Sequence, residues 1–480
     1  MSPSSRRRPA TAHEPEPGLS RRSVLTRSAA GVGIALSGSY SGLFGAGAAS
    51  ASSDVARGKR GPAGYGPLVD DPAGLLSLPA GFGYKIVAES GRTRLDSGEP
   101  SPSDPDGTAS FVRHGGNGSV LVVNHEISGS EPAPVPHIPG FVYDTAAKGG
   151  TTNIEVDKDG TRLGQYVSLA GTHNNCAGGR SPWRTWLTCE EAESLSGQIK
   201  PHGYVFEVDP YDQDANRDPE PIKALGRYAH EALVIDPDTG TIYLTEDAGN
   251  PNGLLYRWTP PGSALPLGNG VLRTLPADAG ALEALRATTL AGAHVPDLSG
   301  ATAPGATYRA AWTTVPDRDA RTLSTRKQLP NSAVTRSRKL EGMWWNDGGA
   351  YFVCSFARFG DGSVGQHDGQ IWFLDALAQT IELKLRFAYT PADQDGDPDG
   401  PDNITVSAYG GLILAEDGDG KNHLVGSTDS GETFFFARND DAGDSEFTGP
   451  NFSNNKKILF ANIQSPGWVF AIQGPFARQR

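Results

Sequence analysis

Residues 171–191 gather several chemically active side chains in one short stretch. A polar turn carries a thiol, Cys176, beside two amides, Asn174 and Asn175, and the apolar strand that follows ends in two adjacent glutamates. A thiol, amide oxygens and paired carboxylates can supply both soft and hard ligands to metal ions. A loop followed by a strand with an exposed acidic end would have the same composition, so the interpretation depends on the rest of the chain.

Similar polar groups recur along the chain, either just before an apolar strand or at its end. Motifs before strands include His230-Glu231-Ala232, Lys339-Leu340-Glu341-Gly342 and Pro401-Asp402-Asn403-Ile404. With the residues at strand ends, the candidate metal ligands are Glu126, Cys176, Glu190, Glu191, Glu231, Glu246, Asp247, Glu341, Asp402, Asn403, Glu416 and Asp417.

The elements that must position these residues form a repeat. A short apolar strand ends in a polar group, and a second apolar strand begins near a glycine, as in residues 242–247 and 253–258. Six such units of about 50 residues predict an all-β fold, a six-bladed β-propeller over residues 76–475. Two sandwich domains would also be rich in strands, but they would not need polar ends to recur at one point of each unit.

Equivalent positions in propeller blades converge on the central axis, so the candidate ligands would form one ring. Carboxylates packed together raise one another's pKa values unless cations compensate their charge. The pattern therefore predicts a multi-metal centre. The alternative is a set of exposed turns, where Asp and Asn are common because they hydrogen-bond locally.

Composition agrees with an all-β, cation-binding protein. Gly (61) and Pro (36) are abundant in the 480 residues, and long helical periodicity is scarce. A formal net charge of −13 argues against nucleic acid as a partner and suits hard cations. Of the three cysteines, Cys189 and Cys354 lie inside apolar strands, which favours a packing role and leaves Cys176 as the chemical candidate.

The first residues are interpreted as an export signal. Ser20-Arg21-Arg22-Ser23-Val24-Leu25 is a twin-arginine pattern, a mild apolar stretch follows, and residues 1–51 end at a small-residue cleavage site. That stretch is too weakly apolar for a membrane span, and a disordered basic tail is the alternative. We therefore expect export by the twin-arginine machinery, to a secreted or cell-envelope location, with no stable span in the mature chain.

Two further segments complete the predicted organisation. Residues 52–75 are expected to be a Gly/Pro linker. The segment from about 262 to 335 is an insertion, which we expect to form a lid containing one helix over residues 279–286.

The motifs together resemble one known family, the PhoX-type alkaline phosphatases. The resemblance covers roughly residues 75–470 and rests on N-H-E (124–126), N-C-A-G-G-R-S-P-W-R-T-W-L-T-C-E-E (175–191), R-Y-A-H-E-A (227–232), Y-L-T-E-D (243–247), E-G-M-W-W (341–345) and L-A-E-D-G (414–418). The second of these is highly specific, whereas the others are short. The twin-arginine pattern agrees with the family.

The resemblance implies a secreted phosphomonoesterase on a six-bladed propeller, with Fe³⁺ and Ca²⁺ ions and a metal-bound oxo or hydroxide as nucleophile. It makes Cys176 an iron ligand and Glu231, Glu341 and Asp402 carboxylate ligands, while Asn175 and Lys339 contact the phosphate of a small phosphoester. Glu126, Glu190, Glu191, Glu246, Asp247 and Glu416 would be further metal ligands.

One position departs from the family pattern. The resemblance leads us to expect arginine two residues before the Glu-Gly pair, where this chain has Lys339. Lysine offers a point charge instead of a planar fork. Arg338 is adjacent, but in a regular strand it would face the opposite way.

Two other functions fit the same architecture. A calcium-dependent propeller lactonase would need carboxylates around one calcium and give Cys176 no role. A non-catalytic secreted propeller would hold only structural calcium and turn over no phosphoester.

Overall fold

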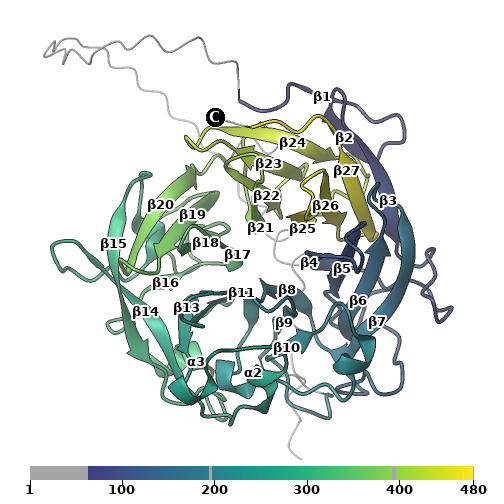
Figure 1. Ribbon diagram of the computed structural model, residues 1–480. Coiled ribbons are helices and arrows are strands. Elements are labelled where there is room, and N and C mark those ends of the chain that lie inside the picture. The colour runs from purple at the N-terminus through teal and green to yellow at the C-terminus, as the bar shows by residue number, and fades with distance from the viewer. Residues whose placement is uncertain (1–62, 194–196, 392–395, 479–480) are drawn as a thin grey trace, which may run out of the picture. The chain divides into compact units, whose positions relative to one another are not determined.

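Strands make up nearly all the regular structure in the computed structural model, which describes residues 63–193, 197–391 and 396–478. The predicted signal, residues 1–51, lies outside the described residues. Between residues 63 and 478 the sheets are arranged in a propeller-like ring (Figure 1), and all pairings between named strands are antiparallel. The prediction of an all-β, propeller-like fold is therefore confirmed.

Four of the sheets are small. The first contains β4 (Pro105–Val112), β5 (Ser119–His125), β6 (Gly149–Val156) and β7 (Arg162–Thr172). The second contains β8 (Asn175–Arg180), β9 (Trp186–Glu190) and β10 (Val205–Val208). A third contains β21 (Pro401–Val406), β22 (Leu412–Glu416), β23 (His423–Ser427), β24 (Thr433–Asn439), β2 (Leu76–Pro79) and β1 (Leu68–Val69). The fourth contains β25 (Phe447–Phe452), β26 (Ile458–Ile463), β27 (Trp468–Gln473) and β3 (Gly83–Glu89).

The remaining sheet has ten strands, and it overturns the prediction of six separate blades. It runs through β11 (His230–Ile235), β12 (Ile242–Glu246), β13 (Gly253–Thr259), β14 (Ala281–Thr289), β15 (Thr307–Thr314), β20 (Thr380–Phe387), β19 (Gly369–Asp375), β18 (Gly349–Cys354) and β17 (Leu340–Asn346), with β16 (Arg336–Ser337) on β13. Two repeat units merge because β15 pairs with both β14 and β20. The described residues thus form five sheets.

The predicted lid with a helix over 279–286 was wrong. Residues 281–289 form β14, in which Leu282 and Ala284 are buried and Glu283 between them is partly exposed. Ala, Leu and Glu favour helices in isolation, but pairing with β13 and β15 on either side outweighs that preference. The predicted insertion therefore contributes two strands, β14 and β15, to the ten-stranded sheet.

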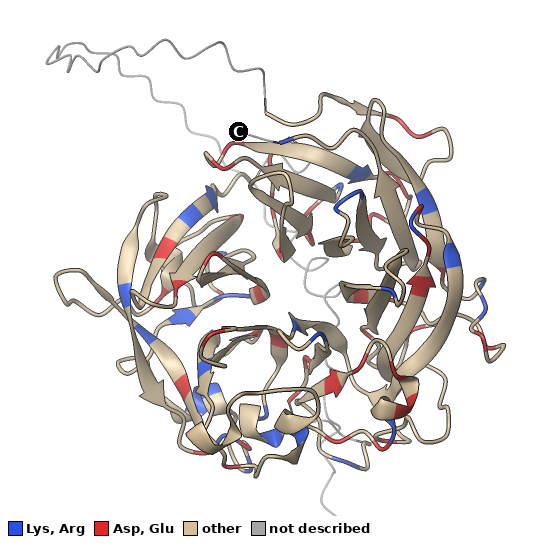
Figure 2. Cartoon of the chain, viewed as in Figure 1, with Lys and Arg blue, Asp and Glu red and all other residues tan. Residues whose placement is uncertain are grey.

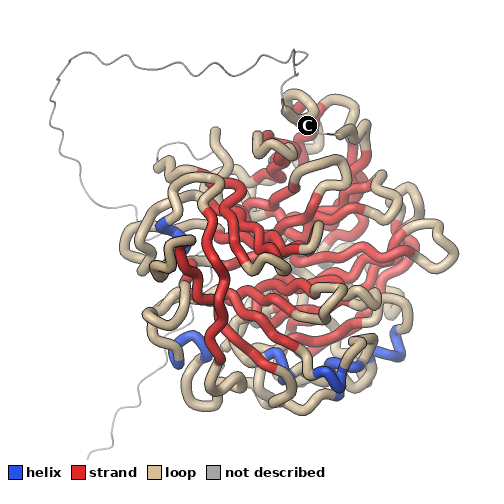
Figure 3. Tube along the Cα trace, turned by 60° about the vertical axis from the view of Figure 1, so that its left-hand side comes forward, coloured by secondary structure: helices blue, strands red, loops and turns tan. Residues whose placement is uncertain are grey.

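Helices are short and few in the described residues. They are α2 (Val271–Thr274), α3 (Thr325–Gln328) and four 3₁₀ turns: η1 (Gln213–Asn216), η2 (Lys223–Leu225), η3 (Gly262–Ala264) and η4 (Leu298–Gly300). Figure 3 shows them as short blue segments among red strands. None of the helices described is long and apolar enough to cross a membrane.

Apolar side chains fill the space between neighbouring sheets. For example, Leu121 and Val123 of β5 pack with Phe460 of β26 and Val469 of β27, and all four are buried. Burying each such side chain contributes roughly 1.5–3 kcal/mol. This face-to-face packing fixes where the inner edge of each sheet lies.

Six strands form the innermost layer: β4, β8, β11, β17, β21 and β25, and each contacts the next in a closed cycle. The close approach depends on glycine. A Cβ at Gly107 would lie 2.5 Å from Cα of Ala177 on β8, and one at Gly342 would lie 2.8 Å from the carbonyl oxygen of Asp402 on β21. Larger residues at these positions would push the inner strands apart.

Candidate metal centre

A β-bulge interrupts each of the six innermost strands near its start. The register with the second strand shifts between Pro105 and Thr108 in β4, and the other five strands have shifts at equivalent places. A bulge leaves a residue outside the regular pairing and re-aims its side chain. In five strands the first residue within the bulge is a possible metal ligand: Asp106, Cys176, Glu231, Glu341 and Asp402.

Three overlapping groups of possible ligands lie at this inner ring, and acidic residues occur on several centre-facing strands (Figure 2). In each group the ligand atoms lie within 4.8 Å of one another; the groups are Cys176–Glu191–Glu231, Glu231–Glu341–Asp402 and Asp402–Asp417–Glu446. Glu231 and Asp402 each belong to two groups. The groups therefore form one continuous arc.

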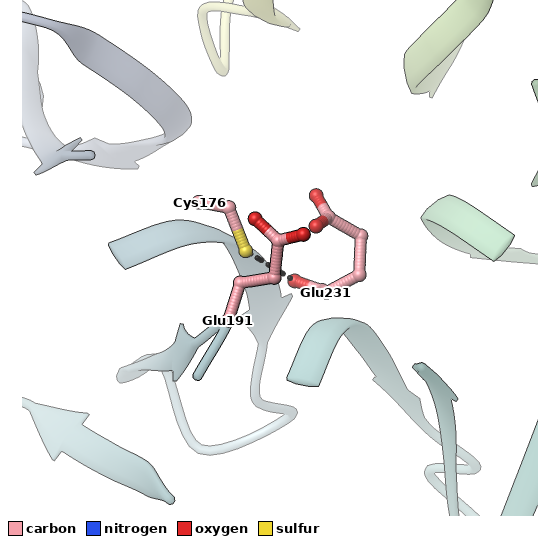
Figure 4. Close-up of side chains that lie close together, drawn as sticks. All are labelled: Cys176, Glu191 and Glu231. Carbon is pink, nitrogen blue, oxygen red and sulfur yellow. Dashed lines mark hydrogen bonds between the residues drawn. The ribbon is translucent and has the colours of Figure 1, made fainter. Parts of the chain in front are cut away.

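The thiol at one end of the arc is held by the neighbouring inner strand. Sγ of Cys176 lies 3.2 Å from the carbonyl oxygen of His230 and 3.5 Å from that of Glu231, to which it can donate. Figure 4 shows the side chains of Cys176, Glu191 and Glu231 gathered in one place. Burial, and then the charges of Glu231 and Glu191, raise the pKa of this thiol well above its usual value.

Two amides extend the arc to Glu126 and Asp106. Nδ2 of Asn174 donates to Oε1 of Glu126 and to Oε2 of Glu191, both at 3.1 Å. Nε2 of Gln464 donates to Oδ2 of Asp106 at 3.1 Å and to Oε2 of Glu126 at 2.5 Å. The acidic groups therefore belong to one connected network.

The carboxylates of this network lie so close together that nearby positive charge would stabilise them. Burial, and then Glu126, Glu446 and Asp402, raise the pKa of Asp106 well above its usual value. Lys339 brings one cation: its Nζ lies 3.3 Å from Oε1 of Glu341 and 3.5 Å from Oδ2 of Asp417. One ammonium cannot balance this many carboxylates, so the residues fit bound metal ions.

The donor set also says which kinds of ion would fit. The two groups that contain Glu341, Asp402, Asp417 and Glu446 offer only carboxylate oxygens, the ligands of hard cations such as calcium. The group with Cys176 adds a softer sulfur ligand, which suits a transition metal such as iron.

Three predicted ligands do not enter these groups. Glu190, Glu246 and Glu416 end β9, β12 and β22, and all three are buried. Each accepts hydrogen bonds from backbone N–H groups. Glu190 accepts from His173 N, Gly203 N, Tyr204 N and His202 Nδ1; Glu246 accepts from Leu254 N and Tyr256 Oη and pairs with Arg326; Glu416 accepts from Asp399 N and from N and Nδ1 of His423.

Asn175, Asp247 and Asn403 were also predicted and also lie outside the three groups. Asn175 donates from Nδ2 to Thr188 at 3.0 Å, and its Oδ1 accepts from Thr172 at 2.6 Å, so its amide is held inside the protein. Oδ1 of Asp247 is buried without a hydrogen bond to the described residues. Asn403 also hydrogen-bonds internally, since its Oδ1 accepts from Gly449 N at 2.6 Å.

Sequence reasoning missed Asp106, Glu446 and the bridging amide of Gln464. Asp106 had a signal: like Cys176, Glu231 and Glu341, it starts an inner strand and precedes Gly or Ala. Glu446 lies just before β25 and shares no such pattern. Its position depends on the ring closing, which local sequence does not reveal.

A cavity of about 450 Å³ is lined by residues of all six innermost strands. Its lining includes Ala177, Ala232, Gly342 and Asn403, each of which follows a candidate ligand in sequence, as well as Trp345.

Comparison with known proteins identifies the family. The family model described as alkaline phosphatase PhoX matches residues 63–467. The chain belongs to the PhoX alkaline phosphatase family. The resemblance inferred from the motifs is thus confirmed, and membership supports a phosphatase at the family level.

Other comparisons add little about this PhoX-family chain. No curated protein sequence matches it significantly. Among solved structures, a gluconolactonase from Xanthomonas campestris is 13% identical with a TM-score of 0.38, covering 86% of this chain and 99% of its own. The PQQ domain of pyranose dehydrogenase from Coprinopsis cinerea is 9% identical with a TM-score of 0.44, covering 83% and 97%. Likenesses this weak do not favour a lactonase.

Proposed function

We propose that the protein is a metal-dependent phosphomonoesterase that releases inorganic phosphate from small phosphoesters. The observation that carries the proposal is the arc of three ligand groups that share Glu231 and Asp402, with Lys339 beside it. Membership of the PhoX family supports the reaction type. A lactonase would not need the thiol group at one end of the arc.

We propose Fe³⁺ for the group with Cys176 and Ca²⁺ for the all-carboxylate groups. Bound cations would neutralise the phosphoryl oxygens and act as Lewis acids when the ester bond breaks. Glu231 and Asp402, which are shared between groups, would hold neighbouring ions, while Asn174 orients Glu126 and Glu191 through its amide.

Lys339 would bind the phosphate. Its ammonium already faces the arc, and a hydrogen bond from Nζ to a phosphoryl oxygen that strengthens as charge develops lowers the barrier. Asn175 would act indirectly, because its bonds to Thr172 and Thr188 fix the start of the bulge that presents Cys176.

We further propose that the enzyme acts after export by the twin-arginine route. The support is the Ser20–Leu25 pattern and the mild apolar stretch after it. Replacing Arg21 and Arg22 by Lys should retain the protein in the cytoplasm, as cell fractionation would show; undiminished export of that variant would contradict the route.

The test of the reaction is elemental analysis of the folded protein together with hydrolysis of p-nitrophenyl phosphate and of gluconolactone. We expect iron and calcium with phosphatase turnover that is lost on chelation. Turnover of the lactone alone, or calcium with no turnover of any phosphoester, would refute the proposal.

Two buried thiols give a matched pair of variants. Cys176→Ala should remove iron and lower kcat/KM by about 10²–10³-fold, the usual cost of losing one group that stabilises the transition state. Cys189→Ala is the control, because Cys189 is equally buried in the same core cluster but belongs to none of the ligand groups. Full activity with normal iron content in Cys176→Ala would contradict the role of the thiol.

A further inference from the structure

Arg338 and Lys339 face the same aromatic ring, although neighbours in a regular strand point to opposite faces. The Lys339 ammonium lies 4.9 Å from the centre of the Phe356 ring, and the Arg338 guanidinium lies 5.9 Å from it. The alternation is broken because Lys339 has a φ of 47° and both residues lie between β16 and β17. Arg338 therefore does not point away from Lys339, as it would in a regular strand.

This arrangement places Arg338 beside the candidate metal centre. From Phe356, Lys339 reaches Glu341 and Asp417, which are members of the acidic arc. On its other side, Nη1 of Arg338 would lie 3.2 Å from a Cβ at Gly249, in the turn two residues after Asp247. The guanidinium thus shares one phenyl ring with the ammonium that contacts the arc.

Neighbouring arginines are held by several hydrogen bonds, whereas Arg338 has only one long ion pair and one ring contact among the described residues. Arg358 donates to the carbonyl oxygens of His367 and Ala357 and pairs with Asp368 at 2.6 Å. Arg336 donates to Asn331, Asn252, Arg326 and Leu329. Arg338 has one ion pair, from Nε to Oδ2 of Asp361 at 3.7 Å, and no hydrogen bond to another described residue.

The position and the open donors of Arg338 point to a ligand. Its side chain is 23% exposed, its Nε is buried without a hydrogen bond to the described residues, and its guanidinium lies over the Phe356 ring. A planar guanidinium binds carboxylate or phosphate through two parallel hydrogen bonds. A lysine for the scissile phosphate with an arginine at the same aromatic ring suits an ester that carries two anionic groups.

We propose that Arg338 selects phosphoesters whose alcohol portion carries a second anionic group, a carboxylate or another phosphate. The proposal rests on the phosphomonoesterase function proposed above. It makes Arg338 a specificity determinant, whereas Lys339 and the acidic arc serve every phosphoester.

Three esters on one carbon skeleton test this. Glycerol 3-phosphate has a neutral alcohol, 3-phosphoglycerate adds a carboxylate, and 2,3-bisphosphoglycerate adds a phosphate as well. In the holoenzyme, kcat/KM should be higher for the two esters that carry the extra anion. In Arg338→Gln, the ratio of kcat/KM for 3-phosphoglycerate to that for glycerol 3-phosphate should fall about tenfold, as expected for a charge-assisted hydrogen bond. Arg338→Glu should lower the ratio further, and Arg338→Lys should give an intermediate value.

The control is Arg92→Gln, a surface arginine whose side chain is 81% exposed; it should not change the ratio. Whichever anionic ester loses more in Arg338→Gln identifies the second group. An unchanged ratio, or an equal fall for all three esters with metal content intact, would overturn the role of Arg338 and leave the phosphatase standing. A wild-type enzyme that hydrolyses none of the esters, p-nitrophenyl phosphate included, would overturn the proposed function and this inference with it.

Discussion

The glutamates that end two of the strands have different surroundings from the carboxylates that follow them by one residue. Glu190 and Glu416 are buried in their sheets and accept hydrogen bonds from backbone N–H groups and a histidine. Glu191 and Asp417, the next residues, belong to the ligand groups of the inner ring. The pleat explains the difference, because successive residues of a strand point to opposite sides.

The two kinds of carboxylate teach that residue type alone does not mark a ligand. Glu190 is fully satisfied by four donors from the protein, which leaves little capacity for a cation. Glu231 and Asp402 lie among other carboxylates, where a cation lowers their electrostatic energy. A buried carboxylate is therefore structural or functional according to the charge of what surrounds it.

The largest effect should come from Glu231, which belongs to two ligand groups. Glu231→Gln keeps the shape but removes a charge, so we expect loss of more than one kind of metal ion and a fall in kcat/KM of about 10²–10³-fold. Elemental analysis and p-nitrophenyl phosphate hydrolysis would measure both. Glu190→Gln serves as the contrast, because the folded fraction of that variant should keep its metal ions. Equal metal loss in the two variants would erase the distinction between the regions.

Glu190→Gln should instead lower stability. An amide cannot accept all four hydrogen bonds that the carboxylate accepts, and it leaves the buried His202 with Asp144 as its one charged partner. Breaking a buried charge pair costs about 3–5 kcal/mol, so the urea midpoint should fall well below that of wild type. A change under about 1 kcal/mol would mean that water replaces the missing acceptor.

The smallest expected effect concerns pH. Burial opposes protonation of His202, but hydrogen bonds and charge from Glu190 and Asp144 outweigh it and raise its pKa above 6.5. The resulting stability is fully present below pH 6.5, the unfolded value, and is lost as pH rises through the folded pKa. A tenfold difference in proton affinity between the folded and unfolded chain is worth about 1.4 kcal/mol. Urea unfolding from pH 6 to 9 should show a steeper decline for wild type than for His202→Gln, and parallel curves would contradict the assignment.

Much of the fold was predictable because strands leave a local signature. Short apolar runs such as residues 242–246 gave the correct strands, and polar residues at their starts and ends predicted the ring. The merging of two units through β15 was not predictable, because it depends on an edge contact between distant strands. Neither was the left-handed backbone of Lys339, where Arg338 and Lys339 approach the same aromatic ring.

The sequence predicted the kinds of ligand at the candidate site better than it predicted which residues belong to the site. Cys176, Glu231, Glu341 and Asp402 were expected and do lie together. Asn175 was expected to face the phosphate, but Asn174 bridges Glu126 and Glu191 instead, since its φ of 52° places it at the turn between β7 and β8. The sequence cannot show which of two adjacent amides faces the acidic groups, because that depends on this backbone angle.

The pairing of early strands with late ones has a consequence for how the chain is made. β3 completes the sheet of β27, and β2 lies on β24, so segments near residue 80 receive their partners only when residues 433–473 exist. Until then their backbone N–H and C=O groups are unpaired strand edges, which invite pairing with other chains. The ribosome must therefore release nearly the whole chain before the ring can close, and the cell has to protect an adhesive early segment during that interval.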